Sequence, residues 1–204
     1  MTRRTPQEVR QLLLGAARST FAARGYAGSS TREISDAAGV SEALLFRHFG
    51  TKANLFELAV LDPFHAFMEG YVEGRPDIPG GSPPPEVPTR DYIETLYDIL
   101  TANRELVMAL LAARAFEVQL PASPELSGAL DRLEPTVAIE LARRGLTDVD
   151  VPVTIRVTFA MVVALAVFQD WLFPPEQRPD RQRIIDEMVQ FMIHGLARDG
   201  AVPA

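Results

Sequence analysis

The chain has 204 residues, a net charge of −7 and no cysteine. This length suffices to bury a substantial core in one domain, or in a small domain joined to a larger one. The lack of cysteine excludes disulfides, thiolate metal sites and a cysteine nucleophile. The longest apolar stretch, 157–168, is about a dozen residues where a bilayer span needs roughly twenty, and no signal peptide is apparent, so we expect a soluble, cytoplasmic protein without membrane contact.

The charge is unevenly distributed along the chain. Residues 1–60 carry eight basic and five acidic side chains, a net +3, whereas residues 61–204 sum to −10. A basic end on an acidic body is expected when one end meets a polyanion. Chance variation of surface charge is the alternative interpretation.

Helix signals begin at once. Thr5-Pro6-Gln7-Glu8 is a capping box with proline at the first helical position, and it predicts a helix over 6–24 that Gly25 ends. Ser30 to Glu33 forms a second capping box, which starts a helix of barely two turns that ends at Gly39. Ser41 is the predicted N-cap of a third, equally short helix that ends at Phe49.

The remainder also predicts helices. One runs from Thr51 toward Tyr71 with a bend at Pro63, and Gly74 to Thr89 is an exposed loop because it is rich in proline and glycine. Five more helices follow, at about 89–102, 104–120, 124–145 with a kink at Pro135, 152–173 and 180–198. No alternation typical of strands is present, so the predicted fold is all-α with about nine helices, divided into residues 1–50 and 51–204.

The last two predicted helices have no face that favours water. Residues 157–168 are apolar nearly all round, and the final helix carries Ile184, Ile185, Met188, Val189 and Phe191. Helices of this kind must be covered on all sides, and in a chain this small a second subunit is a natural cover. We therefore expect a homodimer formed through 152–173 and 180–198.

The second and third helices, joined by a tight turn at Gly39-Val40, form a helix-turn-helix pattern. In such a motif the second helix lies in the major groove of DNA. Leu45 and Phe49 are predicted to anchor that helix from behind, which directs Arg47 outward.

An ordered series of segments carries a family resemblance through the first sixty residues. The segments are Leu13-Leu14-Gly15-Ala16-Ala17, Phe21, Gly25-Tyr26, Thr31-Arg32-Glu33-Ile34, Ala38-Gly39-Val40-Ser41, Leu45-Phe46-Arg47-His48-Phe49 and Lys52-Ala53-Asn54-Leu55-Phe56. This series resembles the TetR family of transcriptional repressors. The resemblance implies an all-helical homodimer that binds a double-stranded DNA operator and releases it when the C-terminal domain binds a small-molecule effector.

Residue by residue, the resemblance implies a DNA-contacting set. Its members are Thr31, Arg32, Ser41, Glu42, Ala43, Leu44, Phe46, Arg47, His48 and Lys52. Arg47 is the strongest candidate for reading a base, because arginine makes bidentate hydrogen bonds to guanine. Phe46 departs from the family's usual tyrosine and cannot bond a phosphate, and Glu42 either accepts from a cytosine amino group or compensates the helix dipole.

Ligand contacts are predicted in the C-terminal domain for a small, largely apolar molecule. The candidates combine apolar side chains with a few polar ones that would orient the ligand, and they are His65, Phe67, Met68, Met108, Leu111, Arg114, Glu117, Phe168 and Trp171. Gln169 and Asp170 are further polar candidates. Each of these side chains can equally be an ordinary member of the core.

Nothing in the sequence indicates an enzyme, a metal site or a cofactor. G-x-S-x-G, P-loop and G-x-G-x-x-G patterns are absent, and the three histidines are far apart in the sequence. Two alternatives stay open. One is a helical hydrolase that uses Asp170 or Glu117 with a histidine, and the other is a helix-turn-helix scaffold that has lost DNA binding.

Overall fold

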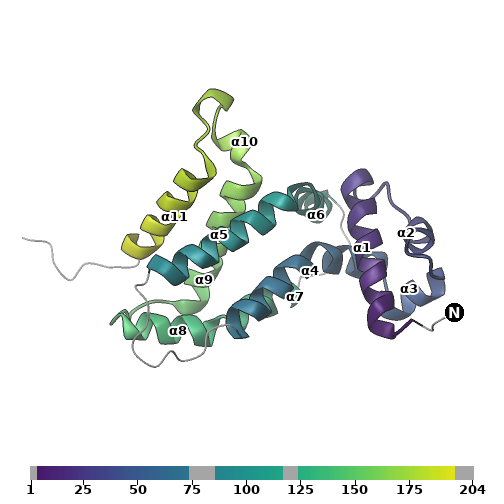
Figure 1. The fold of residues 1–204 in the computed structure, drawn as a ribbon, viewed down its shortest axis with the longest axis horizontal. Coiled ribbons are helices and arrows are strands. Elements are labelled where there is room, and N and C mark those ends of the chain that lie inside the picture. The colour runs from purple at the N-terminus through teal and green to yellow at the C-terminus, as the bar shows by residue number, and fades with distance from the viewer. Residues whose placement is uncertain (1–3, 74–85, 117–123, 196–204) are drawn as a thin grey trace, which may run out of the picture. The chain divides into compact units, whose positions relative to one another are not determined.

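The computed structural model describes residues 4–73, 86–116 and 124–195, and within these ranges the chain is helical without a strand. This confirms the predicted all-α class (Figure 1). Contacts divide the chain into two compact units. The first holds residues 1–65 and 103–126, and the second holds residues 66–102 and 127–204.

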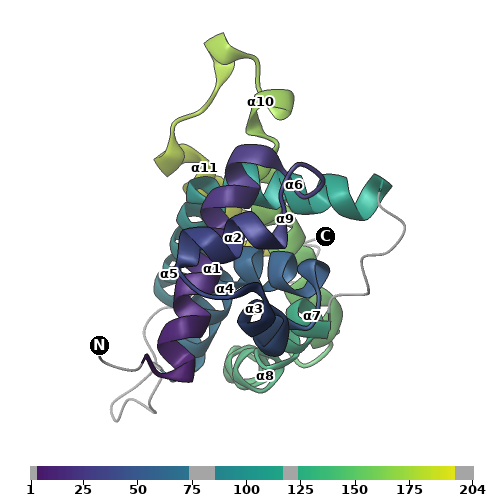
Figure 2. The same ribbon diagram turned by 90° about the vertical axis from the view of Figure 1, so that its right-hand side faces the viewer.

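The first unit is built on three N-terminal helices: α1 (Pro6–Arg24), α2 (Thr31–Ala38) and α3 (Glu42–Phe49). Both predicted capping boxes are present, with the Thr5 and Ser30 side chains accepting from the backbone of Glu8 and Glu33. Helix α2 packs on α1 and on α3, as Figure 2 shows from the side of these helices. The sequence signals thus place the helix ends correctly.

Two further helices complete this unit. Helix α4 (Lys52–Glu73) runs through Pro63 without interruption, and its first part belongs here. Helix α6 (Arg104–Phe116) packs against α1. The shared core contains the fully buried side chains of Phe21, Leu45 and Phe56, and Leu106 and Leu110 of α6 add to it.

The second unit is centred on α5 (Glu86–Ala102), which packs against both α9 (Val151–Val167) and α11 (Arg181–Gly195). Ile93, Leu96, Val162 and Ile185 are fully buried in this unit. Arg181 donates to both carboxylate oxygens of Asp98 at 2.7 Å, which ties α11 to α5. The unit also contains α7 (Pro124–Asp131) from Ser127 onward, α8 (Glu134–Arg143), α10 (Gln169–Leu172) and a short 3₁₀ turn, Pro175–Gln177.

Two predicted helices are divided in the structure, so nine expected helices become α1–α11. The predicted 124–145 is wrong as one kinked helix, because α7 ends at Asp131 and α8 begins at Glu134. Pro135 has no N–H to donate to the carbonyl of Asp131, so the chain restarts there instead of bending. The predicted 152–173 is also two helices, since Phe168 has φ −106° and ψ 14° between α9 and α10.

Smaller differences concern helix ends. Helix α5 begins at Glu86, so the last part of the predicted loop 74–89 is helical, while 74–85 lies outside the described residues. Helix α6 ends at Phe116, and the expected continuation to 120 also lies outside them.

Candidate functional site

Helix α3 is anchored on one side and open on the other. Leu45 and Phe49 are 0% and 2% exposed, whereas Phe46 is 43% exposed and Ala43 and Arg47 are also solvent-facing. The four-residue spacing of Leu45 and Phe49 places them on one helix face, so the residues between them project outward. This orientation agrees with the one expected from the sequence.

The turn that positions α3 depends on a glycine. Gly39 adopts the left-handed conformation, with φ 64° and ψ 42°, and donates to the carbonyl of Asp36 at 3.1 Å. Val40 then donates to the carbonyl of Ser35 at 3.0 Å. These two bonds close the C-terminus of α2 and redirect the chain within two residues, because glycine tolerates a positive φ that side chains disfavour.

Three arginines of α1 lie close to acidic side chains. Arg18 lies 2.7 Å from Asp62, with Arg10 at 3.9 Å from the same carboxylate, and Arg24 lies 2.5 Å from Glu33. These contacts support the interpretation that Arg18 and Arg24 are ordinary surface charges.

Arg32 and Arg47 differ from that group. Both are exposed, and within the described ranges neither forms an ion pair. They lie on α2 and α3, the two helices of the predicted motif. Their positive charge is therefore available to an anionic partner.

Glu42 and Thr31 are bonded to each other. The Thr31 hydroxyl donates to the Glu42 carboxylate at 2.5 Å, which links the first turns of α2 and α3. The sequence did not suggest this role for Glu42. Because a hydroxyl carries a single proton, Thr31 cannot donate to a second acceptor while this bond holds.

Lys52 is held by the loop between α1 and α2. Its ammonium donates to the carbonyl of Tyr26 at 2.6 Å and lies 4.3 Å from the centre of the Tyr26 ring. The start of α4 is thereby fixed to that loop. An ammonium has three donors, so this bond still allows a contact with a phosphate.

The other predicted contacts on α3 vary in exposure. Ser41 is the N-cap residue, as predicted, but its exposed side chain makes no capping hydrogen bond. Leu44 and His48 are half-buried at the edges of the outward face. Ser41 therefore has a hydroxyl that the helix does not use.

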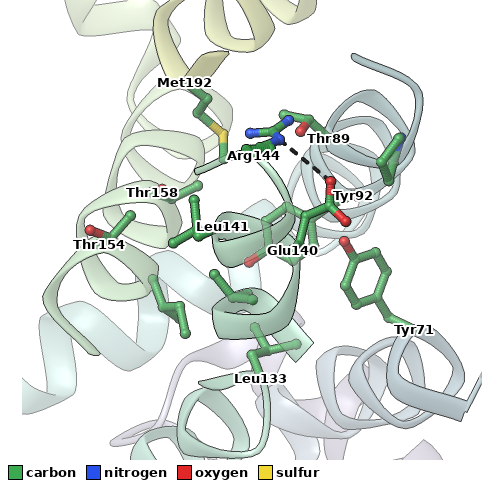
Figure 3. A pocket seen from close by; sticks show the side chains of 13 residues that line it. Tyr71, Thr89, Tyr92, Leu133, Glu140, Leu141, Arg144, Thr154, Thr158 and Met192 are labelled. Atoms are coloured by element: carbon green, nitrogen blue, oxygen red, sulfur yellow. Dashed lines mark ion pairs between the residues drawn. The ribbon is translucent and has the colours of Figure 1, made fainter. Parts of the chain in front are cut away.

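The second unit contains a partly open cavity of about 90 Å³ (Figure 3). It is bounded by the C-terminal part of α4 and by α5, α8, α9 and α11. The lining residues, mostly apolar with a few polar groups, are Tyr71, Pro88, Thr89, Tyr92, Leu133, Val137, Glu140, Leu141, Arg144, Thr154, Ile155, Thr158 and Met192. Such an enclosure suits a small, largely apolar molecule.

The polar groups of the cavity are few. Arg144 Nε lies 3.4 Å from Glu140 Oε1, and their side chains are 17% and 22% exposed. Figure 3 shows the Glu140 carboxylate turned toward the Tyr71 hydroxyl. Burial raises the pKa of the Tyr92 hydroxyl, and the neighbouring Tyr71 raises it further. Tyr92 therefore stays protonated and able to donate a hydrogen bond.

The predicted ligand residues lie elsewhere. The Phe67 ring packs against two lining residues, with its centre 5.8 Å from that of Tyr71 and 5.7 Å from that of Tyr92, and Met68 is buried. Phe168 stacks at 5.5 Å on the exposed Trp171. None of the three aromatic residues lines the cavity described above.

The remaining predicted ligand residues belong to the first unit or are not described. His65 ends the α4 part of that unit, and Met108, Leu111 and Arg114 lie on α6. Arg114 is 3.1 Å from the buried carboxylate of Glu57. Glu117 lies outside the described residues. All nine stay a prediction as ligand contacts.

The sequence did not predict the lining of the cavity, because nothing near its polar pair distinguishes this helix from a surface helix. Glu140 and Arg144 are four residues apart, the spacing of a common surface ion pair. The only available signal was that apolar residues flank this pair within 137–146. Periodicity alone does not distinguish a buried pair from an exposed one.

Two general properties concern the described part of the chain. No helix there combines the length and the apolar character that crossing a bilayer requires. The same residues include no cluster of three or more histidine, aspartate or glutamate side chains suited to a metal ion.

Comparison with known proteins separates the N-terminal segment from the rest. Residues 13–59 match the model of the tetR family of bacterial regulatory proteins. Over 51 residues the chain is 45% identical to the HTH-type transcriptional repressor AcnR of Corynebacterium glutamicum, covering 25% of this chain and 27% of AcnR. Over 56 residues it is 48% identical to an HTH-type transcriptional repressor of Mycobacterium tuberculosis, covering 28% and 29%. These matches thus span little more than a quarter of the curated relatives.

Solved structures extend the similarity to nearly the whole chain. NalD, a repressor of the MexAB-OprM multidrug efflux pump in Pseudomonas aeruginosa, is similar with a TM-score of 0.63 and 21% identity, over 96% of this chain and 99% of NalD. A transcriptional regulator from Rhodococcus sp. Rha1 has a TM-score of 0.62 and 20% identity, over 95% and 99%. At these low identities, the structural similarity shows a shared fold and nothing more. Together, these comparisons show that residues 13–59 are similar to the tetR family of bacterial regulatory proteins and that nearly the whole chain shares the fold of such regulators.

Proposed function

We propose that this protein is a sequence-specific DNA-binding transcriptional regulator that inserts α3 into the major groove. The observation that carries the proposal is the open face of α3, where Arg47 projects from a helix whose opposite side is fixed by Leu45 and Phe49. The curated relatives that share this segment are named as repressors, which favours repression. Such a protein acts on DNA in the cytoplasm.

The contacts divide into base readers and phosphate binders. Arg47 reads a guanine, with Ala43 and Phe46 beside it for apolar contact with a thymine methyl. Arg32 binds a phosphate or a base edge. Lys52, Ser41 and His48 bind the backbone at the rim of the face.

Thr31 and Glu42 need a more specific assignment because they are bonded to each other. The Thr31 backbone N–H lies in the first turn of α2, where helix N–H groups lack intrahelical partners, so it binds a phosphate without loss of the side-chain bond. Glu42 then acts by fixing the two first turns together rather than by touching a cytosine. Leu44 packs at the edge of the same surface.

Two copies of the chain form the active species, through α9 and α11. Both helices carry large exposed apolar side chains, among them Val157 at 58% and Phe191 at 66% exposure. A face of this kind favours a partner. A twofold arrangement sets two α3 helices about 34–36 Å apart, one turn of DNA.

A small, largely apolar ligand in the cavity of the second unit releases the DNA. Tyr71, on the last turns of α4, lines this cavity, while α4 begins with Lys52 in the first unit. One helix thus contributes to both units, which supports a role for it in transmission. The ligand binds more tightly to a dimer whose α3 helices have a different separation from the one that fits DNA. It lowers DNA affinity by as much as its own affinity differs between these two states.

Selection of bound sequences from random duplex DNA tests the DNA-binding proposal. We expect a palindromic motif, an affinity that falls steeply with salt, and for Arg47→Ala a loss of about 1–3 kcal/mol with relaxed specificity at one position per half-site. Arg132→Ala is the matched control, because Arg132 is an exposed arginine of the second unit. An unchanged motif in Arg47→Ala, or no binding of duplex DNA at low salt, would reject the proposal and favour a scaffold that has lost DNA binding.

Sedimentation tests the dimer separately. Val157→Glu and Phe191→Glu should each shift the protein toward monomer, because a carboxylate in an apolar interface is unpaired. Ile139→Glu on α8 is the control, since Ile139 is equally exposed but lies outside the proposed interface. A wild type that sediments as a monomer at all concentrations would refute this part.

A further inference from the structure

We propose that the cavity of the second unit takes an uncharged, mostly apolar molecule that carries a hydrogen-bond acceptor such as a carbonyl, in preference to an organic anion or cation. The inference rests on the proposed function for its consequence, the release of DNA. The binding preference itself depends only on the side chains that line the cavity.

The first argument is the charge of the lining. Among the lining residues that the structure describes, only Glu140 and Arg144 are charged, and they form a pair with 3.4 Å between Oε1 and Nε. The pair is mostly buried and sums to zero. A charged ligand would leave water and find no net opposite charge in exchange, which disfavours both ions.

The second argument is the surplus of donors. Arg144 Nε and Nη2 are buried, and within the described part of the chain neither atom has a hydrogen-bond partner of suitable geometry. A guanidinium has five N–H donors, and buried donors without acceptors are costly. The protonated Tyr92 hydroxyl adds another donor to the lining. An acceptor oxygen on the ligand satisfies this surplus, whereas an ammonium would compete with it.

The third argument is the apolar remainder. Leu133, Leu141, Ile155 and Met192 line the cavity, and Figure 3 shows Leu133 well separated from the Glu140–Arg144 pair. A ligand that meets Arg144 with one oxygen thus has apolar wall for the rest of its body. Burial of that body supplies affinity, and the polar end supplies orientation.

Calorimetric titration of the full-length protein with three probes that share an eight-carbon chain tests the preference. We expect methyl octanoate, the neutral acceptor, to bind at least about tenfold more tightly than octanoate or octylammonium at neutral pH, since each uncompensated buried charge outweighs a hydrogen bond. Equal or tighter binding of octanoate or octylammonium overturns the inference. So does the failure of all three probes to bind.

Removal of one charge at a time from the lining tests the charge argument directly. Glu140→Gln leaves the cavity positive, so octanoate affinity should rise about tenfold, and Arg144→Met leaves it negative, so octylammonium should gain instead. Arg143→Met is the matched control, because Arg143 is exposed and does not line the cavity, and it should keep the wild-type order. An unchanged order of affinities in Glu140→Gln contradicts the charge argument.

A doubly substituted protein covers the case in which one unpaired charge prevents folding. Glu140→Gln combined with Arg144→Met keeps the lining neutral but removes the donors of Arg144. Methyl octanoate should then bind about tenfold more weakly, with neither ion preferred. Undiminished binding of the ester would show that Arg144 is not the anchor.

Measurement of operator binding on the same samples separates the two proposals. An ester that binds tightly without releasing DNA counts against the ligand-controlled regulator and leaves the assignment of the cavity intact. If the protein binds DNA but prefers octanoate to the ester, the inference about the cavity is wrong and the DNA-binding proposal is unaffected.

Discussion

The N-terminal part of the first unit, residues 13–59, is similar in sequence to known regulators, whereas the second unit is similar to solved structures only in its fold. Residues 13–59 contain the Ser30–Glu33 capping box, the Gly39 turn and the anchored α3, all of which depend on residues close together along the chain. The second unit depends instead on contacts between distant residues, such as Arg181 with Asp98. Signals between residues close in sequence are easier to recognise in a single sequence than contacts between distant residues. Substitutions in the two units are therefore expected to differ in the size of their effects.

The largest effect is expected in the core of the first unit. Phe21 is fully buried, with its ring centre 4.6 Å from that of Phe56, so Phe21→Ala should lower the free energy of unfolding by about 3–5 kcal/mol. Urea denaturation measures the loss. Phe46→Ala, which truncates an exposed ring of α3, is the control and should change stability little. Equal losses would mean that the Phe46 ring of α3 is also packed in the core.

The next effect isolates the turn between α2 and α3. Gly39→Ala should cost about 1–2 kcal/mol, because a side chain disfavours φ 64°. Gly15→Ala is the matched control: Gly15 lies inside α1 with no atom within 4 Å of an added Cβ, so alanine should stabilise the protein by about 0.5–1 kcal/mol. Thermal melting of both variants compares them, and destabilisation by Gly15→Ala alone would contradict the turn assignment.

Ser30 and Ser41 are both N-cap residues, but only Ser30 makes a capping hydrogen bond. Ser30 accepts from the backbone N–H of Glu33 at 3.1 Å, so Ser30→Ala should cost about 1 kcal/mol. Ser41→Ala should leave the free energy of unfolding nearly unchanged, since no capping bond is lost, although DNA affinity falls if Ser41 binds a phosphate. Chemical denaturation of the two variants side by side is the measurement. Equal destabilisation would indicate that Ser41 also caps its helix.

The smallest effect lies in the second unit and depends on pH. A hydrogen bond from Arg90, and a further one from Gln182, hold the pKa of Asp186 below its ordinary value of 3.8. A carboxylate with a lowered pKa stabilises the fold above its unfolded pKa, and the contribution is lost as the pH falls through the folded pKa. Asp186→Asn should therefore be slightly less stable than wild type near neutrality and indistinguishable from it in strong acid. The exposed Asp148→Asn is the control, and a difference that persists in acid would exclude this linkage.

The sequence predicted the first three helices almost to the residue because their ends are marked by Thr5, Ser30, Gly25 and Gly39. It predicted less of the second unit. Proline inside a helical sequence is compatible with either a bend or a break, so Pro135 alone does not decide between one kinked helix and two. At Phe168 the sequence has no proline or glycine to mark the end of α9.

The same limit applies to the candidate sites. The outward face of α3 followed from the spacing of Leu45 and Phe49, but the bond between Thr31 and Glu42 joins two helices and has no local signature. The cavity brings together side chains from Tyr71 to Met192, so its lining could not be selected from the many apolar residues of the chain. Phe168 and Trp171, which the sequence predicts as ligand contacts, stack on each other instead.

One feature of the fold has a practical meaning for protein engineering. The chain leaves the first unit after His65 and re-enters it at Asn103, and α6 contributes Leu106 and Leu110 to the core while Arg114 meets the buried Glu57. A chimera that joins residues 1–65 to the C-terminal domain of another regulator would therefore lack the core residues of α6 and would leave the buried carboxylate of Glu57 without Arg114. Exchange of DNA specificity between such regulators needs two junctions, or a recipient whose own sixth helix is compatible with the donor.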